Sequence, residues 1–279
     1  FRPSLSQLHD PFLMKDMAAA VDRIERAVHN QERILVYGDY DVDGTTAVAL
    51  MYSFLKTFYP HVDFYIPDRY KEGYGISERG VRFAAENEIS LVIALDCGIK
   101  AIDKVRLAKE LGVDFIICDH HTPGATLPPA IAVLDAKRED CTYPYKELSG
   151  CGVGFKLIQA YAKTHGIDES SLYPYLDLLV VSIAADIVPI TGENRILAYY
   201  GLDRINNTPR PGLKALILQA KVEKEIQISD IVFKIGPRIN ASGRLEHAKA
   251  SVELLISSNL DEAIERAKLV DEVNSTRRN

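Results

Sequence analysis

The fold is decided by the stretch at residues 33–58, RILVYGDYDVDGTTAVALMYSFLKTF. It begins with a short apolar run, Arg33 to Tyr37, and this run ends in Gly38 and Asp39. A segment rich in Ala, Leu and Met follows from Thr45 to Phe58 and has the character of a helix. A buried strand, a polar loop and a helix in this order predict the first unit of an α/β fold.

The same alternation continues along the chain. Further strands are expected at residues 62–66, 91–95, 115–118 and 131–134, with helices at 77–88 and 99–111. Strands that are almost wholly apolar are buried on both faces, which is typical of a parallel sheet covered by helices. We therefore expect a doubly wound α/β fold around a mainly parallel five-stranded sheet.

From about Gly150 onward the strand signal fades and a mostly helical region follows. Helices are expected at residues 153–164, 172–183, 194–206, 212–220 and 260–278. The last of these has no glycine cap and stops with the chain, so it is interpreted as a connecting helix that is cut short.

Composition narrows the class of protein. Of the 279 residues, 47% are hydrophobic, and no stretch approaches the roughly 20 apolar residues that a membrane helix needs. The start, FRPSLSQLHD, lacks an initiator Met and a signal-peptide pattern, which favours a piece of a longer cytoplasmic protein. The four cysteines show no paired metal spacing, as expected in a reducing compartment. The net charge of −6 argues only weakly against nucleic-acid binding, because a carboxylate cluster lowers it by itself.

Acidic and imidazole side chains follow three of the predicted strands. Three aspartates lie in the loop at residues 39–43, Asp96 follows the third strand, and Asp119, His120 and His121 follow the fourth. In an open parallel sheet, ligands bind outside the carboxyl ends of the strands. These side chains are therefore expected at one shared edge of the sheet.

Clustered carboxylates repel one another unless a cation lies between them. A set rich in oxygen with a single imidazole suits Mn²⁺ or Mg²⁺ rather than zinc, for which Cys and His usually predominate. The acids suffice for two ions, and ions roughly 3.5–4 Å apart activate water and hold the oxygens of a phosphoryl group. The pattern therefore predicts hydrolysis of a phosphoester.

Each segment taken alone also has a plainer interpretation. The loop at 39–43 is typical of a turn or helix cap, and Asp96 alone is equally consistent with a cap. A calcium loop is excluded, because residues 49–51 are Ala, Leu and Met where a ligand Glu is expected. Residues 119–121 are harder to dismiss, since three polar groups after a buried strand need partners. Cys97 is read as a small packing residue, and the five histidines outside the cluster as surface or packing residues.

The stretch SGCGVGFK at residues 149–156 superficially suggests a nucleotide loop. It fits neither the dinucleotide nor the Walker spacing. A tight turn that opens a helix is the preferred interpretation, although its backbone amides would be able to approach a phosphate.

With these motifs the chain resembles the DHH phosphoesterase family, named for the Asp-His-His found here at residues 119–121. YGDYDVDG at 37–44 resembles the first family motif, LDCG at 95–98 the second, and AADIVP at 184–189 the fourth. The resemblance implies metal ligation by Asp41, Asp43, Asp96 as the bridge, His120 and Asp186, with Asp39 and Asp119 as further ligands or close supports. It also implies that His121 faces the scissile phosphate, although its proton-transfer role stays open.

Two other stretches are similar to the branch of this family that degrades single-stranded DNA. They are PDRYKEGYG at 67–75 and GPRINASGR at 236–244, where Ser242 replaces a usual alanine. The resemblance implies substrate contacts by Arg69, His121, Arg238, Asn240 and Arg244, because guanidinium groups match phosphate oxygens. Alternatively, Arg238 and Arg244 pair with nearby acids such as Glu246. Tyr70 and Tyr74 either stack on bases or pack under the loop.

The implied organisation is a DHH catalytic domain over residues 1–205, with its sheet at 33–135 and a helical extension at 150–205. A helical region at 206–279 follows, and the family's C-terminal DHH-associated domain is expected to be absent from the chain. The implied activity is a 5′ to 3′ exonuclease on single-stranded DNA, used in repair and recombination with repair or replication proteins as partners. The alternatives are a DHH enzyme for short oligoribonucleotides, cyclic dinucleotides or pyrophosphate, and a non-catalytic DNA-binding scaffold.

Overall fold

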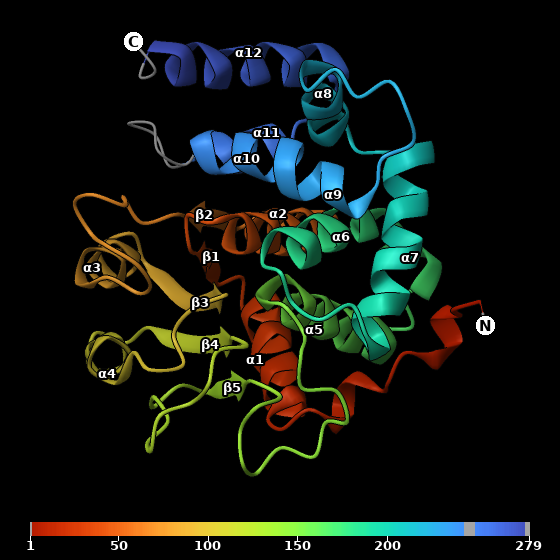
Figure 1. Ribbon diagram of the computed structural model, residues 1–279. Coiled ribbons are helices and arrows are strands. Elements are labelled where there is room, and N and C mark those ends of the chain that lie inside the picture. The colour runs from red at the N-terminus through yellow and green to blue at the C-terminus, as the bar shows by residue number, and fades with distance from the viewer. Residues whose placement is uncertain (1, 243–248, 277–279) are drawn as a thin grey trace.

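The centre of the molecule is a five-stranded parallel sheet, seen in a computed structural model that describes residues 2–242 and 249–276 (Figure 1). In spatial order its strands are β2 (Val62–Tyr65), β1 (Arg33–Gly38), β3 (Ile89–Leu95), β4 (Asp114–Cys118) and β5 (Ala132–Leu134). Every pairing is parallel. The predicted fold class is therefore confirmed, and all five expected strands are present.

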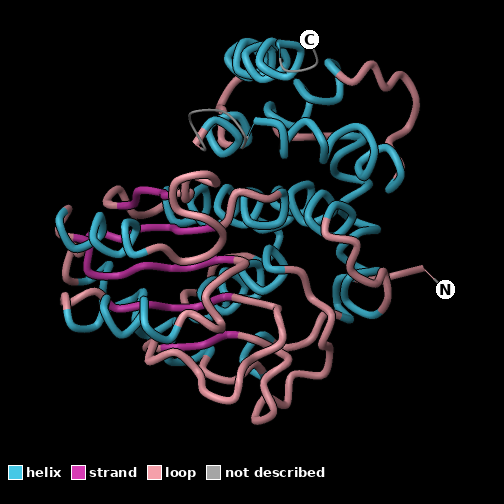
Figure 2. Tube along the Cα trace, turned by 60° about the vertical axis from the view of Figure 1, so that its left-hand side comes forward, coloured by secondary structure: helices cyan, strands magenta, loops and turns pink. Residues whose placement is uncertain are grey.

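Helices cover both faces of the sheet, because alternate strand residues point to opposite sides. Ile34 and Val36 of β1 belong to the apolar cluster that also holds residues of α1 (Met17–His29), α2 (Val42–Lys56) and α5 (Gly150–Thr164). Leu35 and Tyr37 belong instead to the cluster that includes α3 (Glu78–Glu86) and α4 (Ile102–Glu110). Figure 2 shows the strands between these two layers.

Helix α1 is an element that the sequence analysis missed. Its buried positions Met17, Ala20, Val21, Ile24 and Ala27 recur at helical spacing, so the signal was present in the sequence. The helix packs against the sheet and against α5. Two short 3₁₀ helices, η1 (Leu5–Gln7) and η2 (Pro11–Leu13), precede it.

The second half of the chain is helical, as expected. The predicted helix at 172–183 is split into a 3₁₀ segment η3 (Glu169–Tyr175) and α6 (Leu176–Ala185), and Pro174, which has no amide hydrogen to donate, lies inside η3. The other helices are α7 (Gly192–Asn207), α8 (Pro211–Gln219), α9 (Ile228–Asp230), the π-helical segment η4 (Ile231–Ile235), α10 (Gly236–Ser242), α11 (Ala250–Leu255) and α12 (Leu260–Thr276). The elements from α9 to α11 were not predicted.

Residues of α8, α11 and α12 share one apolar cluster with the sheet-covering helices. The division at residues 205/206 stays a prediction. Among the described residues no helix is long and apolar enough to cross a membrane.

Candidate metal centre

The candidate site lies where the strand order reverses. β1 has β2 on one side and β3 on the other, so the connections that leave β1 and β3 diverge and open a crevice at their carboxyl ends. The loops after β1, β3 and β4 all end at this edge of the sheet. They carry the acids that the sequence analysis singled out.

Asp41 and Asp43 enter the site from the start of α2. Asp41 is the N-cap, and its side chain accepts a hydrogen bond from the Gly44 amide at 2.7 Å. Asp43 lies in the first helical turn and is 1% exposed. Burial, with the charge of Asp43 second, raises the pKa of Asp41. The start of α2 therefore brings the carboxylates of Asp41 and Asp43 near each other.

The glycine-rich turn at residues 149–152 holds Asp43. The amides of Gly150 and Cys151 donate to the two oxygens of this carboxylate at 2.7 and 2.8 Å, and the Ser182 hydroxyl donates at 2.7 Å. Ser149 caps α5 through the Gly152 amide. The preferred interpretation as a helix-opening turn is thus confirmed, and two of its amides bind an aspartate rather than a nucleotide.

Three segments meet at His120. Its Nε2 lies 2.9 Å from Asp96 Oδ1, 3.4 Å from Asp43 Oδ2 and 3.6 Å from Asp186 Oδ2. Burial lowers the pKa of His120, so the imidazole is neutral near pH 7 and has a lone pair for a cation. Asp186 is the C-cap of α6, and burial followed by the charges of Asp43 and Asp41 raises its pKa to about 7.

Asp96 is a buried acid of the cluster with one side-chain oxygen that has no hydrogen-bond partner among the described residues. It is 1% exposed, and its Oδ2 accepts no hydrogen bond from any described residue. Burial, followed by the charges of Asp43 and Asp41, raises its pKa well above the ordinary value. Its backbone is left-handed, with φ of 59°, a conformation that non-glycine residues rarely adopt outside constrained sites.

Asp119 and His121 form a hydrogen-bonded pair within the cluster. His121 Nδ1 donates to Asp119 Oδ1 at 2.6 Å, while the Ile99 amide donates to Oδ2 at 3.0 Å. Burial acts to raise the pKa of Asp119, but the His121 hydrogen bond and charge outweigh it and hold the pKa below its ordinary value. The hydrogen bond to Asp119 raises the pKa of His121. Asp119 therefore orients an imidazole whose side chain is 45% exposed.

The side chain of Asp39 accepts hydrogen bonds from two backbone amides. The amides of Tyr40 and Gly75 donate to its two oxygens at 2.7 and 3.1 Å. Burial, with Asp41 second, raises its pKa to about 7. Asp39 thus ties the loop at 67–75 to the end of β1, a supporting position. Asp39 and Asp41 both lie outside the two groups that have ligand atoms close enough to share an ion, which are Asp96, Asp119, His120 and His121, and Asp43, His120 and Asp186.

The predicted substrate-contacting residues are more dispersed. The Arg69 guanidinium lies 5.0 Å from the centre of the Tyr40 ring, next to Asp39. Arg238 is on α10, where it donates to the Lys234 carbonyl at 2.7 Å, and no described acid pairs with it. Asn240 is exposed on the same helix. Arg244, like Glu246, lies outside the described residues.

Asp135 is an acid that the sequence analysis did not select. It follows β5, is fully buried, and its Oδ2 has no hydrogen-bond partner among the described residues. Burial raises its pKa to about 7. Asp39, Asp96 and Asp119 were selected because each is an acid directly after a strand of the sheet. The same criterion would have selected Asp135.

Several known proteins are similar to this chain in fold and sequence. The single-stranded-DNA-specific exonuclease RecJ of Bacillus subtilis (strain 168) is 45% identical over 273 residues, 98% of this chain and 34% of that protein. A crystal structure of exonuclease RecJ bound to manganese has a TM-score of 0.87 at 33% identity, covering 99% of this chain and 68% of that one. RecJ in complex with Mn²⁺ from Thermus thermophilus has a TM-score of 0.82 at 32% identity, covering 95% and 38%.

The family is established by a match to part of the chain. The chain spans between about a third and a half of the length of the curated RecJ relatives that it matches. A family model described as the DHH family, N-terminal domain, matches residues 33–183, which include all five strands and most of the acidic cluster. Since this match covers more than half of the 279 residues, the chain belongs to the DHH family.

Proposed function

We propose that this chain is the catalytic core of a divalent-metal-dependent exonuclease that removes nucleotides from single-stranded DNA in the 5′ to 3′ direction. The observation that carries the proposal is the convergence of Asp43, Asp96, His120 and Asp186 from four separate segments. The relatives named as single-stranded-DNA-specific exonucleases support the substrate class. A role in DNA repair and recombination follows from the same resemblance.

The residues of the site fit a divalent cation. Asp96 Oδ2 is buried without a hydrogen-bond donor, and its neighbours are further carboxylates. An unpaired buried carboxylate is costly, and a cation is the group that removes that cost. The donors are carboxylate oxygens with one neutral imidazole, which suits Mn²⁺ or Mg²⁺. The residues that would hold the ions are Asp41, Asp43, Asp96, His120 and Asp186.

When bound, two such ions would supply an activated water and charge neutralisation at a phosphodiester. The chain's own groups supply orientation and binding. The Gly150 and Cys151 amides and Ser182 fix the rotamer of Asp43. Asp119 fixes the ring of His121 through Nδ1, and no described residue accepts from Nε2. A protonated His121 is therefore able to donate a hydrogen bond from Nε2 to a phosphate oxygen.

The test is made on the full-length protein with 5′-phosphorylated single-stranded DNA, duplex DNA, a short oligoribonucleotide and a cyclic dinucleotide. We expect Mn²⁺- or Mg²⁺-dependent release of mononucleotides from the single-stranded DNA. Preferred cleavage of the oligoribonucleotide or cyclic dinucleotide would contradict the substrate assignment. Strands blocked at one end test the direction of degradation: a 5′ block should stop the reaction, and a 3′ block should not.

Asp96→Asn tests the proposed role of Asp96 as a metal ligand, because it removes the charge and keeps the size of the side chain. We expect more than about a 100-fold loss of activity and of Mn²⁺ affinity, because a proposed ligand is removed. In EDTA the variant should unfold at a higher temperature than the wild type, since a buried charge beside other carboxylates is gone.

Glu265→Gln is the control for this variant. It neutralises a carboxylate on α12 that is 72% exposed, so activity and metal affinity should stay unchanged. Equal activity in Asp96→Asn and wild type would contradict the mechanism. Absence of Mn²⁺ binding by the wild type would favour a scaffold protein instead.

A further inference from the structure

A groove of about 650 Å³ opens beside His121 and runs along the start of α4. Its walls include Tyr74, Lys100, Lys104, Asp119, His121 and Thr122. It shares Asp119 and His121 with the candidate centre but includes none of Asp43, Asp96 and Asp186. Sites for small ligands commonly have volumes of about 300–1,000 Å³, so the groove has room for a nucleotide.

The wall of this groove carries two unpaired positive charges. Neither Lys100 nor Lys104 forms an ion pair or hydrogen bond with a described residue, and Lys104 is half-buried. Asp103, the acid between them, is paired with Arg106 at 2.9 Å. Asp119 is already engaged by His121 and the Ile99 amide. The two ammonium groups are therefore available to an anionic ligand.

The groove also has an aromatic side chain in its lining. Tyr74 is 53% exposed, its hydroxyl donates to the Asp96 carbonyl at 3.4 Å, and its ring makes an edge contact with His121 at 6.4 Å. This contact holds one face of the groove next to the residue proposed to meet the scissile phosphate. A groove lined by both an aromatic ring and lysines suits a nucleotide, with its base or sugar on the ring and its phosphate on the amines.

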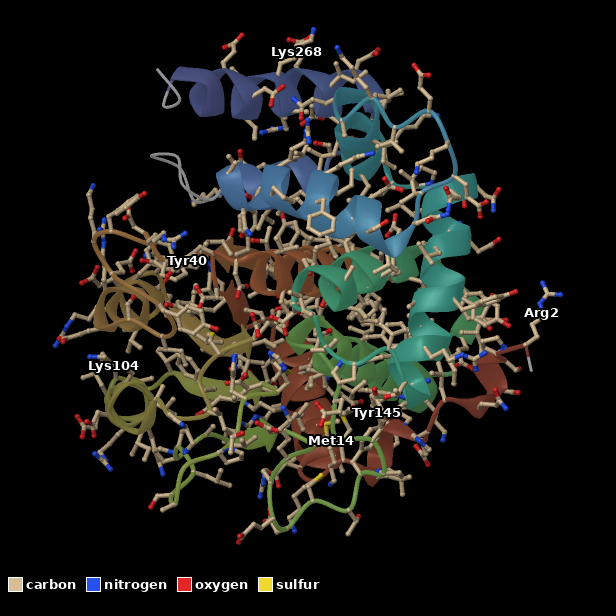
Figure 3. All side chains as sticks on the ribbon, in the orientation of Figure 1. Arg2, Met14, Tyr40, Lys104, Tyr145 and Lys268 are labelled. Carbon is tan, nitrogen blue, oxygen red and sulfur yellow. The ribbon has the colours of Figure 1, made fainter. Side chains whose placement is uncertain are left out.

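We propose that this groove is a subsite for a nucleotide phosphate that neighbours the scissile one, and that Lys100 and Lys104 bind it. The inference rests on the proposed function, because it takes the scissile phosphate to lie at the cluster around His120. Figure 3 shows Lys104 on α4. The phosphate is either the terminal 5′-phosphate or the next phosphodiester of the strand, and the experiment separates these sources.

The experiment measures equilibrium binding by the full-length protein without hydrolysis. A 3′-fluorescein-labelled, 5′-phosphorylated oligothymidylate is titrated in EDTA, and anisotropy is followed between about 50 and 200 mM NaCl, the range over which phosphate contacts are salt-sensitive. For Lys100→Ala and Lys104→Ala we expect about 5- to 10-fold weaker binding. We also expect the slope of log K against log[salt] to fall by about 0.7 per lysine, because one fewer counterion is released.

Lys109→Ala is the matched control, because Lys109 is an exposed lysine of the same helix that does not line this groove. Its affinity and salt slope should equal those of the wild type. Equal effects of all three substitutions, no effect of Lys100→Ala and Lys104→Ala, or no binding by the wild type would overturn the proposal. Thermal unfolding verifies that each variant is folded.

An oligonucleotide with a 5′-hydroxyl identifies the phosphate. If the two alanine variants lose nothing against this probe, the subsite holds the terminal phosphate; if the loss persists, it holds the next phosphodiester. Both results support the subsite. Because no cleavage is measured, lysine-dependent binding by a protein that hydrolyses no DNA would refute the proposed function and leave the subsite standing.

Discussion

Asp96 combines two unfavourable features at a single residue. Its backbone is left-handed, which costs of the order of 1–3 kcal/mol, and one carboxylate oxygen is buried without a hydrogen bond from the described residues. The neighbouring chain holds it in place: its amide donates to the Cys118 carbonyl at 2.8 Å, and Gly150 packs against its side chain. Such an arrangement is explained if a cation offsets the unpaired charge.

Gly150 is the position from which this arrangement is most easily disturbed. A Cβ added there would lie 2.5 Å from Asp96 Cβ and 2.7 Å from Asp96 Oδ1. Gly150→Ala should therefore displace Asp96 and weaken Mn²⁺ binding by about 10- to 100-fold, the usual effect of disturbing the support of a ligand. Titration calorimetry of the metal-depleted protein measures this affinity.

Gly152→Ala is the control in the same helical turn. Its Cβ would approach Ser149 Oγ at 3.3 Å and Leu148 Cβ at 3.4 Å, contacts that small side-chain shifts relieve. Mn²⁺ affinity in this variant should stay close to that of the wild type. Wild-type affinity in Gly150→Ala would show that Asp96 tolerates the added methyl group and does not need its present position.

At the scale of elements, a buried ion pair joins α5 to α7 and to the N-terminal segment. Lys156 of α5 lies 2.6 Å from Glu193 of α7, and neither side chain is exposed. Its Nζ also donates to the His9 carbonyl at 2.9 Å, and the His9 amide donates to Glu193 at 3.1 Å. The Tyr143 hydroxyl donates to the other Glu193 oxygen. Helix α5 also carries the Gly150 and Cys151 amides that bind Asp43. The ion pair therefore helps to fix the position of the helix that holds Asp43.

Lys156→Met should lower the free energy of unfolding by about 3–5 kcal/mol, because it leaves the Glu193 carboxylate buried without its cation. Urea denaturation measures the change. The double variant Lys156→Met with Glu193→Gln should recover much of the loss, since no buried charge then remains.

Lys163→Met is the control on the same helix. Lys163 is 59% exposed and pairs with Asp10 at 3.3 Å, so the expected change is below about 1 kcal/mol. Equal losses in Lys156→Met and Lys163→Met would show that the buried pair contributes nothing specific to holding these elements together.

At the scale of the whole molecule, the carboxylates of the site link stability to pH and to metal. The pKa values of Asp39 and Asp186 are raised to about 7 in the folded chain, against about 4 for an unfolded aspartate. Between these values the folded state binds more protons than the unfolded state. The metal-free protein should therefore lose stability as pH rises from about 4 to about 7.

The corresponding measurement is thermal unfolding at about pH 5 and about pH 7.5, with Mn²⁺ and with EDTA. In EDTA, Asp39 and Asp186 should make the protein less stable at the higher pH than at the lower. The gain in Tm on adding Mn²⁺ should be larger at the higher pH, because the ligands then carry their charge before the ion binds. A larger gain at the lower pH would contradict the electrostatic account of the site.

The sequence by itself determined the strands, the helices that follow them and the acids at their ends. These features are local, because burial of a strand and capping of a helix depend on neighbouring residues, as Asp41 at the start of α2 shows. The apolar runs and the loop at 39–43 therefore sufficed for the fold class and for most of the acidic cluster. The missed helix α1 also had a local signal in the spacing of its apolar residues.

Only the tertiary structure decided which distant groups complete the site. The amides that hold Asp43 come from residues 150 and 151, the unpaired oxygen belongs to Asp96, and the Lys100 and Lys104 groove opens beside His121. These juxtapositions follow from the strand order β2-β1-β3-β4-β5 and from the packing of α5 and α6 against α2. Packing sums many weak contacts between segments far apart in the chain, so no local pattern encodes which segments meet.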